Sequence, residues 1–331
     1  TFRDWELIIC DAFSDDGSWE YLKRFGDDPR CWLFQAPRQG VYAGINECLC
    51  RARGDYVYIA TSDDTMTPDC LEKLVAALDA HPECGLAHCC LTAIDERSRP
   101  IEGWWERMHG VAFYGDLIRQ AHLRKAPRDA LLYCGLYTVY LSLTQLLIRR
   151  SLFDRTGLFP TRYGAEGDFQ WGFKAAFLTD TIHIPEHLAT WRRRAGQATR
   201  EEQDLGQRCG RYCRMIEEAL PELRRINAGR FGAIDWQIAL KYYRMEQLLS
   251  LMRTAPHRRA RIGRLLRFLG LRPDVVGWYL VGRCRGSMAT LPPRYEFMTE
   301  LLKQFALQGT VELFDGAFVN TCCASSVRQL P

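Results

Sequence analysis

The first ninety residues alternate between short apolar runs and segments with helical spacing, and this alternation is the strongest constraint on the fold. The runs of strand length are Trp5–Cys10, Cys31–Phe34, Tyr56–Ala60 and Gly85–Cys90. Between them, Val41–Ala52 and Leu71–Leu78 carry apolar residues three or four positions apart, which is typical of helices. Such alternation favours a mostly parallel sheet with right-handed crossovers and flanking helices. We therefore predict an α/β fold with a nucleotide-binding sheet.

Two adjacent aspartates lie just past the third apolar run. Asp63 and Asp64 follow Tyr56–Ala60 at the carboxyl end of the predicted strand, where ligands bind in open α/β sheets. Neighbouring carboxylates repel each other unless a cation lies beside them, and their hard oxygen atoms suit Mg²⁺ or Mn²⁺. The pair is therefore a candidate site for a metal diphosphate. The alternative is that these aspartates only hydrogen-bond the backbone of the turn before Pro68.

Composition narrows the class of protein. The chain has 331 residues, of which 47% are hydrophobic and 25% charged, as expected for a globular protein of one large or two ordinary domains. A net charge of +4 is small for this length, so we expect no nucleic-acid partner. The fourteen cysteines include no C-x-x-C pair, which favours reduced thiols in a cytoplasmic protein over disulfides or zinc.

The second half of the chain changes from sheet-forming to helical sequence. Strand patterns continue in three runs, which are Tyr140–Ile148, Ile182–Ile184 and Leu188–Trp191. From Glu201 onward, long charged segments carry apolar residues at helical spacing. We therefore predict a sheet domain over residues 1–197 and a helical C-terminal region over residues 198–331.

One segment, Ala130–Ile148, is apolar enough to raise the question of a membrane span. A span needs about 20 strongly apolar residues. This segment contains Ser142, Thr144 and Gln145, and two arginines follow it directly. We therefore expect a buried helix end followed by a strand.

Three segments resemble, in order and at natural spacing, the motifs of family two glycosyltransferases, which have the GT-A fold. TFRDWELIICDAFSDDGS is similar to the family's second-strand segment. QGVYAGINECLCRARGDYVYIATSDD resembles its glycine, asparagine and "A-x-G-[DE]-Y" helix, followed by the D-x-D strand. SLFDRTGLFPTRYGAEGDFQW resembles its "F-x-x-x-G-x-F" and acidic acceptor-site segment. The resemblance covers residues 1 to about 200 and leaves the helical region without a recognised motif.

This resemblance implies a reaction and a set of binding roles. It implies transfer of a sugar from a nucleotide-diphosphate sugar, with a UDP-sugar favoured, to the hydroxyl of a saccharide or lipid-linked acceptor, as in polysaccharide biosynthesis. By the same resemblance, Asp11 contacts the base, and Gly40 and Asn46 are further nucleotide-binding positions. Asp63 lies near the ribose, and Asp64, together with Asp63, holds a divalent cation, Mn²⁺ or Mg²⁺.

The resemblance also implies that Asp168 is the catalytic base. A carboxylate there could take the acceptor hydroxyl proton during in-line attack with inversion, while the metal ion stabilises the leaving diphosphate. Gly167 separates Asp168 from Glu166 where the family often has adjacent acids, so Glu166 is a second candidate base. The structural alternatives are a turn-capping role for Asp11 and a helix N-cap role for Asp168.

Several features depart from the family pattern. The family's first strand and helix would precede Thr1, so we interpret the sequence as trimmed at its start. Thr61–Ser62 replace the first aspartate of the commoner D-x-D, and Ile45 stands where many members have an arginine. Trp191–Arg194 stands where processive synthases have Q-x-x-R-W, which favours transfer of a single sugar. Its arginines either hold the diphosphate or form a solvated run of charge.

Two further segments are candidates for contact with the acceptor or its surroundings. Trp104, Trp105 and His109 either line an acceptor site or fill the core. Residues 257–272 combine one apolar helical face with surrounding arginines, a pattern that suits peripheral contact with an anionic membrane surface. The alternative is a helix that packs on the catalytic domain through that face.

Two other functions stay open beside the transferase. The chain could be a sugar-phosphate nucleotidyltransferase, or a non-catalytic glycosyltransferase-like binding scaffold. It contains no P-loop, dinucleotide fingerprint or esterase elbow.

Overall fold

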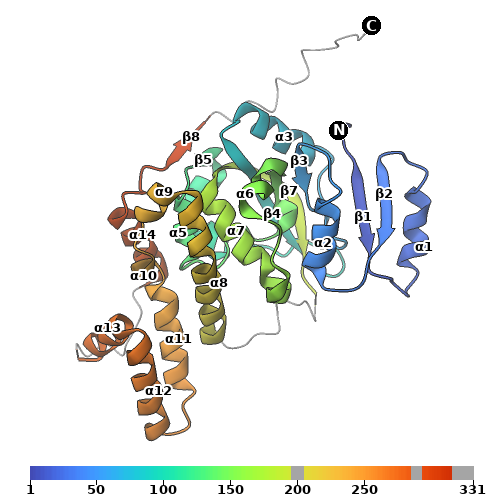
Figure 1. The fold of residues 1–331 in the computed structure, drawn as a ribbon. Helices are drawn as coiled ribbons and strands as arrows, with labels where there is room; N and C mark the ends of the chain where they lie inside the picture. The colour runs from blue at the N-terminus through green and yellow to red at the C-terminus, as the bar shows by residue number, and fades with distance from the viewer. Residues whose placement is uncertain (195–204, 285–292, 315–331) are drawn as a thin grey trace.

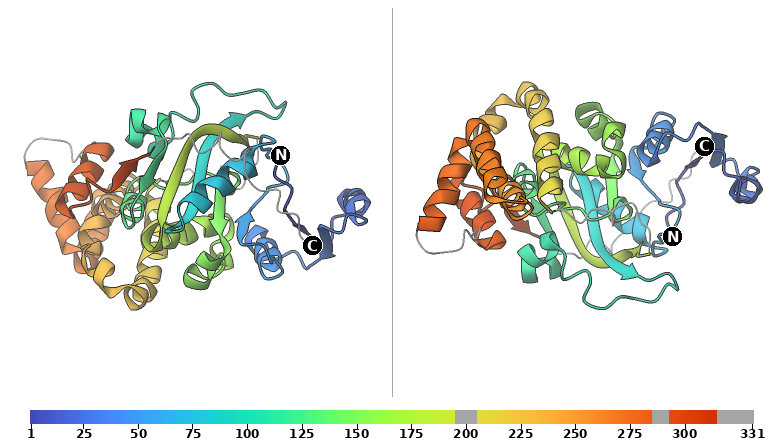
Figure 2. Two further views of the ribbon diagram at one scale, coloured as in Figure 1. Left: turned by 90° about the horizontal axis from the view of Figure 1, so that it is seen from above. Right: turned by 90° about the horizontal axis from the view of Figure 1, so that it is seen from below.

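The computed structural model describes residues 1–194, 205–284 and 293–314 of the chain. A six-stranded sheet forms the centre, with helices packed around it (Figure 1). A separate two-stranded sheet lies at one side of the molecule, and the C-terminal helices lie at the opposite side, as both views of Figure 2 show.

Eight strands form the two sheets. The small sheet pairs β1 (Leu7–Asp11) with β2 (Cys31–Gln35), and these two strands are parallel. The large sheet contains, in spatial order, β3 (Tyr56–Tyr58), β6 (Leu146–Arg149), β4 (Cys84–Ile94), β7 (Asp180–Arg192), β5 (His122–Arg124) and β8 (Val311–Leu313). These counts refer to the described ranges.

Helices connect and cover the strands. Those of the first 194 residues are α1 (Ser18–Leu22), α2 (Val41–Leu49), α3 (Cys70–Ala80), α4 (His109–Tyr114), α5 (Arg128–Tyr133), α6 (Phe153–Thr156) and α7 (Gly167–Leu178). The C-terminal helices are α8 (Leu205–Ile226), α9 (Ala228–Gly232), α10 (Trp236–Ala239), α11 (Lys241–Arg253), α12 (Arg258–Leu271), α13 (Pro273–Cys284) and α14 (Arg294–Gln304). The short 3-10 turns η3 (Leu143–Gln145) and η5 (Thr161–Glu166) matter for the site.

The directions of the strands correct one part of the prediction. The α/β class is confirmed, but the sheet is mixed and not mostly parallel. In the large sheet β4 and β7 are parallel, whereas β3 with β6, β6 with β4, β7 with β5 and β5 with β8 are antiparallel. The reason is that β6 follows a long excursion after β4 and runs back between β3 and β4. Residue patterns mark the strands but not the direction in which a long connection returns.

β7 is a single strand where the sequence pattern predicts two. Cys89 pairs with Ile184, and the next residue, Cys90, pairs with His187, so the ladder skips two residues of β7. One of them is Pro185, which has no N–H to donate and is accommodated by a bulge. Beyond the bulge, the main chain of Leu188 accepts a hydrogen bond from the Thr67 N–H at 2.8 Å. The end of β7 therefore reaches the loop after β3.

Two clusters of buried residues pack on opposite faces of the sheet. Leu147 belongs to the cluster under α3, and Leu146 and Ile148 belong to the other, because side chains alternate along a strand. The second cluster extends without a break from α5 and α7 into α8, α11 and α14. The predicted boundary between residues 197 and 198 lies outside the described residues, and the two-domain division stays a prediction.

A buried polar cluster lies inside the sheet. His88, His122 and His183 come from β4, β5 and β7, and all three are at most 3% exposed. The Nδ1 atoms of His88 and His183 lie 3.3 Å apart. Arg124 hydrogen-bonds His88 and pairs with Asp129 at 2.9 Å. Burial and the Arg124 charge lower the pKa of His88 well below its ordinary value, and they lower that of His122 to about 4. Burial, with His122 and Arg124, likewise lowers the pKa of His183.

The apolar segment Ala130–Ile148 forms buried structure of the kind predicted. It contains most of α5, the turn η3 and the first part of β6. Across the described ranges, no helix has the length and apolar character that crossing a membrane requires.

Candidate active site

The end of β7 clamps the loop that carries Asp63 and Asp64. The Thr61 hydroxyl donates to Asp64 Oδ2 at 2.6 Å, and the Arg192 N–H donates to Asp64 Oδ1 at 2.6 Å. The side chain of Arg194 forms an ion pair with Asp63. Burial raises the pKa of the half-buried Asp64 above its ordinary value, against the effect of the hydrogen bonds from Thr61 and Arg192. The two aspartates are therefore held in place from a distant part of the chain.

The three arginines that follow Trp191 have separate partners. Arg192 donates from Nε to the carbonyl oxygen of Asp63 at 2.8 Å and from Nη1 to that of Asp95 at 2.9 Å. Arg193 lies over the rings of Trp191 and Trp104 at 4.6 and 5.2 Å. Arg192 and Arg193 are thus partly buried and engaged within the fold, whereas Arg194 is exposed. The contact between the Arg192 main chain and Asp64 has no signal in the sequence, because it joins positions 128 residues apart.

The donor atoms around Asp64 fit a divalent cation bound together with a diphosphate. Within residues 1–194, 205–284 and 293–314, no group of three or more His, Cys, Asp or Glu side chains could hold a metal alone. Mg²⁺ at phosphate sites usually takes one or two carboxylates, with phosphates and waters as its other ligands. Asp64 and Asp63 supply that number. A cation there would also favour the ionised form of Asp64, which burial disfavours.

Asp11 ends β1 and is almost fully buried. Its Oδ2 atom accepts hydrogen bonds from the Ser14 N–H at 3.1 Å and from Gln35 Nε2 at 2.8 Å. Burial acts to raise the pKa of Asp11, but the hydrogen bonds from Gln35 and Ser14 outweigh it and hold the pKa below its ordinary value. Asp11 thus makes the turn contact that its structural alternative predicts. Gln35, at the end of β2, is a partner that the sequence reasoning missed.

Gly40 and Asn46 lie at the start and in the middle of α2. Gly40 has φ of 97°, a conformation that favours glycine, and it precedes the first residue of the helix. The Asn46 side chain donates to the Phe159 carbonyl oxygen at 2.8 Å and accepts from the Phe159 N–H at 3.0 Å. Asn46 therefore ties α2 to the segment that leads into η5 and Asp168.

Asp168 lies in the first turn of α7, facing a small hollow. Burial raises its pKa to about 6, and the neighbouring Tyr42 hydroxyl opposes part of that rise. The N-cap of α7 is Glu166, and no side-chain hydrogen bond caps the helix. The structure therefore does not support the N-cap alternative for Asp168. The hollow is lined by Asp168 together with Tyr133, Tyr140, Ser142, Leu143, Leu146, Trp171 and Gly172.

Glu166, the second candidate base, is engaged in an ion pair. Its two carboxylate oxygens accept from Nε and Nη2 of Arg211 at 2.8 and 3.0 Å. Arg211 belongs to α8, so the C-terminal region contributes directly to this part of the site. The sequence reasoning missed Arg211, because a single arginine on a charged helix carries no sign of its partner.

The turn η3 connects the surroundings of Asp168 with those of Asp64. Ser142 and Leu143 line the hollow beside Asp168. Thr144, in the same turn, accepts at its carbonyl oxygen from the Tyr58 hydroxyl at 2.6 Å and donates from Oγ1 to the Thr190 carbonyl oxygen at 3.4 Å. No hydrogen bond or ion pair between described residues joins Asp11, Asp64 or Asp168 to one another. The turn η3 thus links the surroundings of Asp168 and Asp64, and the three predicted site residues make no hydrogen bond or ion pair with one another.

The three aromatic candidates for the acceptor site lie in different parts of the structure. Trp105 is buried in the core below α3. Trp104 lies against Trp191, with ring centroids 4.7 Å apart, beside the clamp of β7. His109 Nδ1 is 3.0 Å from the Tyr295 hydroxyl of α14. Of the three, only Trp104 contacts the segment Trp191–Arg194, which also binds the two aspartates.

Comparison with known proteins gives matches in sequence and in fold. Residues 1–155 match the family described as Glycosyl transferase family 2. The putative glycosyltransferase EpsE of Bacillus subtilis (strain 168) is 37% identical over 84 residues, which are 24% of this chain and 30% of EpsE. The chondroitin synthase of Pasteurella multocida (strain Pm70) is 33% identical over 73 residues, which are 22% of this chain and 8% of the synthase. The matched stretches thus span less than a third of either relative.

A solved structure agrees over more of the chain. S. aureus TarS 1-349, in complex with UDP-GlcNAc, superposes with a TM-score of 0.54 and covers 90% of this chain and 82% of its own, at 14% identity. At this identity the likeness concerns the fold alone. Together with the sequence match it confirms the predicted GT-A-like α/β fold with a helical C-terminal region.

Proposed function

Since residues 1–155 match glycosyl transferase family 2, we propose that the chain transfers a single sugar from a nucleotide-diphosphate sugar to an acceptor hydroxyl. This match confirms the family and the enzyme class that the sequence predicts. The observation that carries the proposal is the turn η3, which lines the hollow beside Asp168 and hydrogen-bonds Tyr58 and Thr190 near Asp64. Burial also raises the pKa of Asp168 to about 6. A carboxyl group with a pKa near neutrality suits a general base at physiological pH.

The proposed donor is a UDP-sugar. Structures of S. aureus TarS contain UDP-GlcNAc and UDP, which supports uracil as the base bound by this chain. In this chain Asp11 would contact the base, and its fixed position on β1 suits that role. Gly40 and the start of α2 would face the diphosphate, because the amino end of a helix favours anions. Asn46 would hold that helix against the segment that leads to Asp168, the proposed catalytic base.

The proposed metal is Mn²⁺ or Mg²⁺, bound by Asp64 with Asp63. Such an ion acts as a Lewis acid that neutralises the charge developing on the leaving diphosphate. Thr61 and Arg192 hold the Asp64 carboxylate in place for this role. Arg194, which pairs with Asp63 in the ligand-free chain, could exchange that carboxylate for a phosphate oxygen.

The proposed chemical step uses Asp168 as the base. The acceptor oxygen forms a bond to the anomeric carbon, its proton passes to the Asp168 carboxylate, and the bond from that carbon to the diphosphate oxygen breaks. Attack from the face opposite the leaving group inverts the anomeric carbon. Glu166 is the less suited base, because its carboxylate would have to leave Arg211 to accept a proton.

The proposed acceptor is a saccharide or a lipid-linked saccharide, and transfer is not processive. Acceptors of the second kind lie at a membrane surface. Peripheral contact through residues 257–272 suits this, because Ile262 and Leu266 of α12 are exposed, as are several of the arginines around them. We therefore propose a cytoplasmic protein that associates with the membrane surface.

One assay tests the proposal against its two alternatives. The chain is incubated with UDP-sugars, an acceptor panel and Mn²⁺. Release of UDP that depends on acceptor supports the transferase. Release of pyrophosphate from NTP and a sugar phosphate supports the nucleotidyltransferase instead, and binding of nucleotide without either product supports the scaffold.

A further inference from the structure

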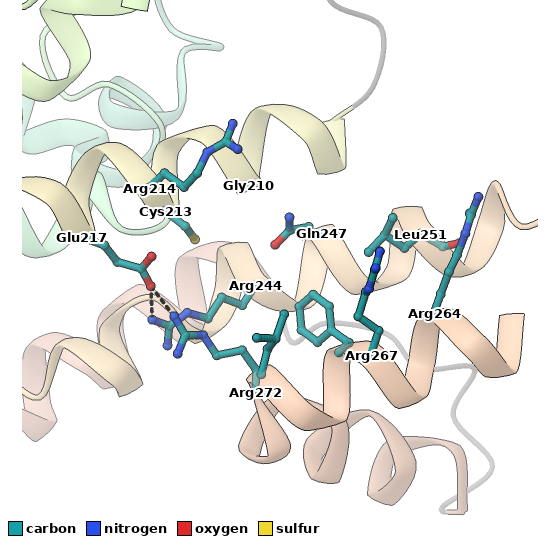
Figure 3. A pocket seen from close by; sticks show the side chains of 12 residues that line it. Gly210, Cys213, Arg214, Glu217, Arg244, Gln247, Leu251, Arg264, Arg267 and Arg272 are labelled. Atoms are coloured by element: carbon teal, nitrogen blue, oxygen red, sulfur yellow. Dashed lines mark hydrogen bonds and ion pairs between the residues drawn. The ribbon is translucent and has the colours of Figure 1, made fainter. Parts of the chain in front are cut away.

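A cavity of about 500 Å³ lies among the C-terminal helices α8, α11 and α12 (Figure 3). None of the aspartates of the proposed active site lines it. Its charged lining is strongly cationic. The ionisable side chains around it are those of Arg214, Arg244, Arg264, Arg267, Arg272 and Glu217. Five positive charges and one negative charge leave a surplus of four.

The single carboxylate is shared by two of the arginines. Glu217 Oε1 accepts from Arg244 Nη2 and from Arg272 Nη2, both at 2.6 Å, as the dashed lines of Figure 3 mark. Arg244 is only 2% exposed, and its Nε atom has no hydrogen-bond partner in the described part of the chain. A buried guanidinium with an unsatisfied N–H beside a cavity is costly unless a ligand or water completes its hydrogen bonds.

The remaining arginines have no acidic partner among the described residues. Arg264 donates to two neutral groups, the Leu251 carbonyl oxygen at 2.7 Å and the Thr254 hydroxyl at 3.0 Å. Arg214 and Arg267 make no hydrogen bond or ion pair with any residue of the ranges given above, and they project from α8 and α12 on different sides of the cavity (Figure 3). Planar guanidinium groups are suited to the oxygen atoms of a phosphate group.

The rest of the lining is mostly apolar. It consists of Gly210, Cys213, Gln247, Leu251, Phe268 and Leu271. Leu271, at the end of α12, is 67% exposed. A small soluble anion would use the arginines but not this leucine. A phosphate group carried on acyl or prenyl chains would use both, because a basic helix with exposed leucines also suits an anionic lipid surface.

We infer that this cavity binds the phosphate headgroup of an anionic lipid while Leu271, at the end of α12, contacts its apolar chains. The inference concerns a second site and does not depend on the reaction proposed for Asp168. α12 lies at the far end of the molecule from the small β1–β2 sheet (Figure 1), so a bound membrane would leave that side uncovered.

The test is co-sedimentation of the whole chain with vesicles of phosphatidylcholine alone and of phosphatidylcholine with phosphatidylglycerol. We expect binding only with the anionic lipid. The variant Arg214→Gln/Arg267→Gln should bind those vesicles about 10-fold more weakly or worse, since each arginine near an anionic surface contributes substantially. The matched control is Arg258→Gln/Arg259→Gln, which removes the same charge from α12 outside the cavity and should weaken binding only about twofold.

Equal losses for the two double variants would overturn the inference, because surface charge alone would then explain binding. Vesicle binding that does not depend on anionic lipid would overturn it as well. A second arm measures thermal stabilisation by inorganic phosphate and by a short-chain phosphatidic acid. Equal effects at equal concentration would make this a site for a free anion, and a selective effect of the short-chain lipid supports the lipid site. A third arm measures binding of the chain to RNA, and binding to RNA without binding to vesicles would assign the cavity to nucleic acid instead.

Discussion

Arg211 of α8 holds both carboxylate oxygens of Glu166, at 2.8 and 3.0 Å. Asp168, two positions later, forms no ion pair with any described residue, and its pKa is raised to about 6. The two acids of this segment are therefore not equivalent. One is fixed by a guanidinium, and the other is free to exchange a proton.

The first prediction follows from this difference. Asp168→Asn should lower kcat by about 100-fold or more, because general-base catalysis contributes about that much, while nucleotide affinity stays near that of the unchanged protein. Calorimetry for UDP binding and initial rates for kcat measure the two quantities on the same preparation.

Glu166→Gln is the matched control for that measurement. It keeps the length of the side chain but weakens the pair with Arg211, so we expect a smaller loss of kcat and a lower melting temperature. An active Asp168→Asn protein together with an inactive Glu166→Gln protein would move the base to Glu166.

Asp64→Asn should weaken metal-dependent nucleotide binding and turnover together. The change removes one charge and one ligand oxygen from the proposed metal site. Calorimetry with UDP, with and without Mn²⁺, checks the prediction. Asp116→Asn, which changes an exposed acid outside the site, should leave both quantities unchanged. Nucleotide affinity of Asp64→Asn that still rises with Mn²⁺ as in the unchanged protein would contradict the assignment.

The rate should depend on pH through Asp168. The carboxylate is the active form of a base, so kcat should fall as the pH drops through about 6, the pKa that burial gives Asp168. Above that value kcat should level off. A pH–rate profile between 5 and 8 gives the apparent pKa. If the fall persists unchanged in the residual activity of Asp168→Asn, another group causes it.

Mild acid should destabilise the fold through the buried histidines. The pKa values of His88, His122 and His183 are lowered in the folded protein, that of His122 to about 4. In the unfolded chain a histidine has its ordinary pKa of about 6.5, so the unfolded chain takes up these protons at a higher pH than the folded protein does. Their contribution to stability is complete above pH 6.5 and falls below it, by up to about 1.4 kcal/mol per pH unit for each histidine.

Urea unfolding at pH 7.5, 6.5 and 5.5 measures that slope. His122→Asn should reduce it, and His257→Asn, at an exposed histidine before α12, should not. The comparison between variants isolates the histidines from Asp168, whose raised pKa acts in the opposite direction in part of the same range. Equal slopes for both variants would show that His122 titrates normally.

Asn46→Ala tests whether Asn46 positions the segment before Asp168. Loss of both hydrogen bonds to the Phe159 main chain should cost about 1–3 kcal/mol of stability and lower kcat more than UDP affinity. Unfolding and calorimetry check this. A loss of UDP affinity alone would instead favour a direct contact between Asn46 and the nucleotide.

Local patterns predicted much of the fold and located the candidate site, and long-range contacts could not be predicted from them. Apolar alternation and helical spacing located most strands and helices, including the helix that follows Gly40. The apolar run Tyr56–Ala60 also predicted that Asp64 follows a strand. Arg192 and Arg211, however, reach their acidic partners from β7 and α8, so only the folded chain brings them together. The reversal of β6 is likewise a property of the path between strands.

The ring of Phe169 stacks on that of Tyr212 with centroids 3.8 Å apart and 7° between their planes, and Gln170 donates to the Met215 carbonyl oxygen at 2.6 Å. The segment that carries Asp168 is thus built from both halves of the chain. Exchange of the C-terminal helices with those of another family member, as a route to a new acceptor preference, would therefore disturb the segment that carries the proposed base. A functional chimera would therefore have to take both α7 and α8 from the same parent protein.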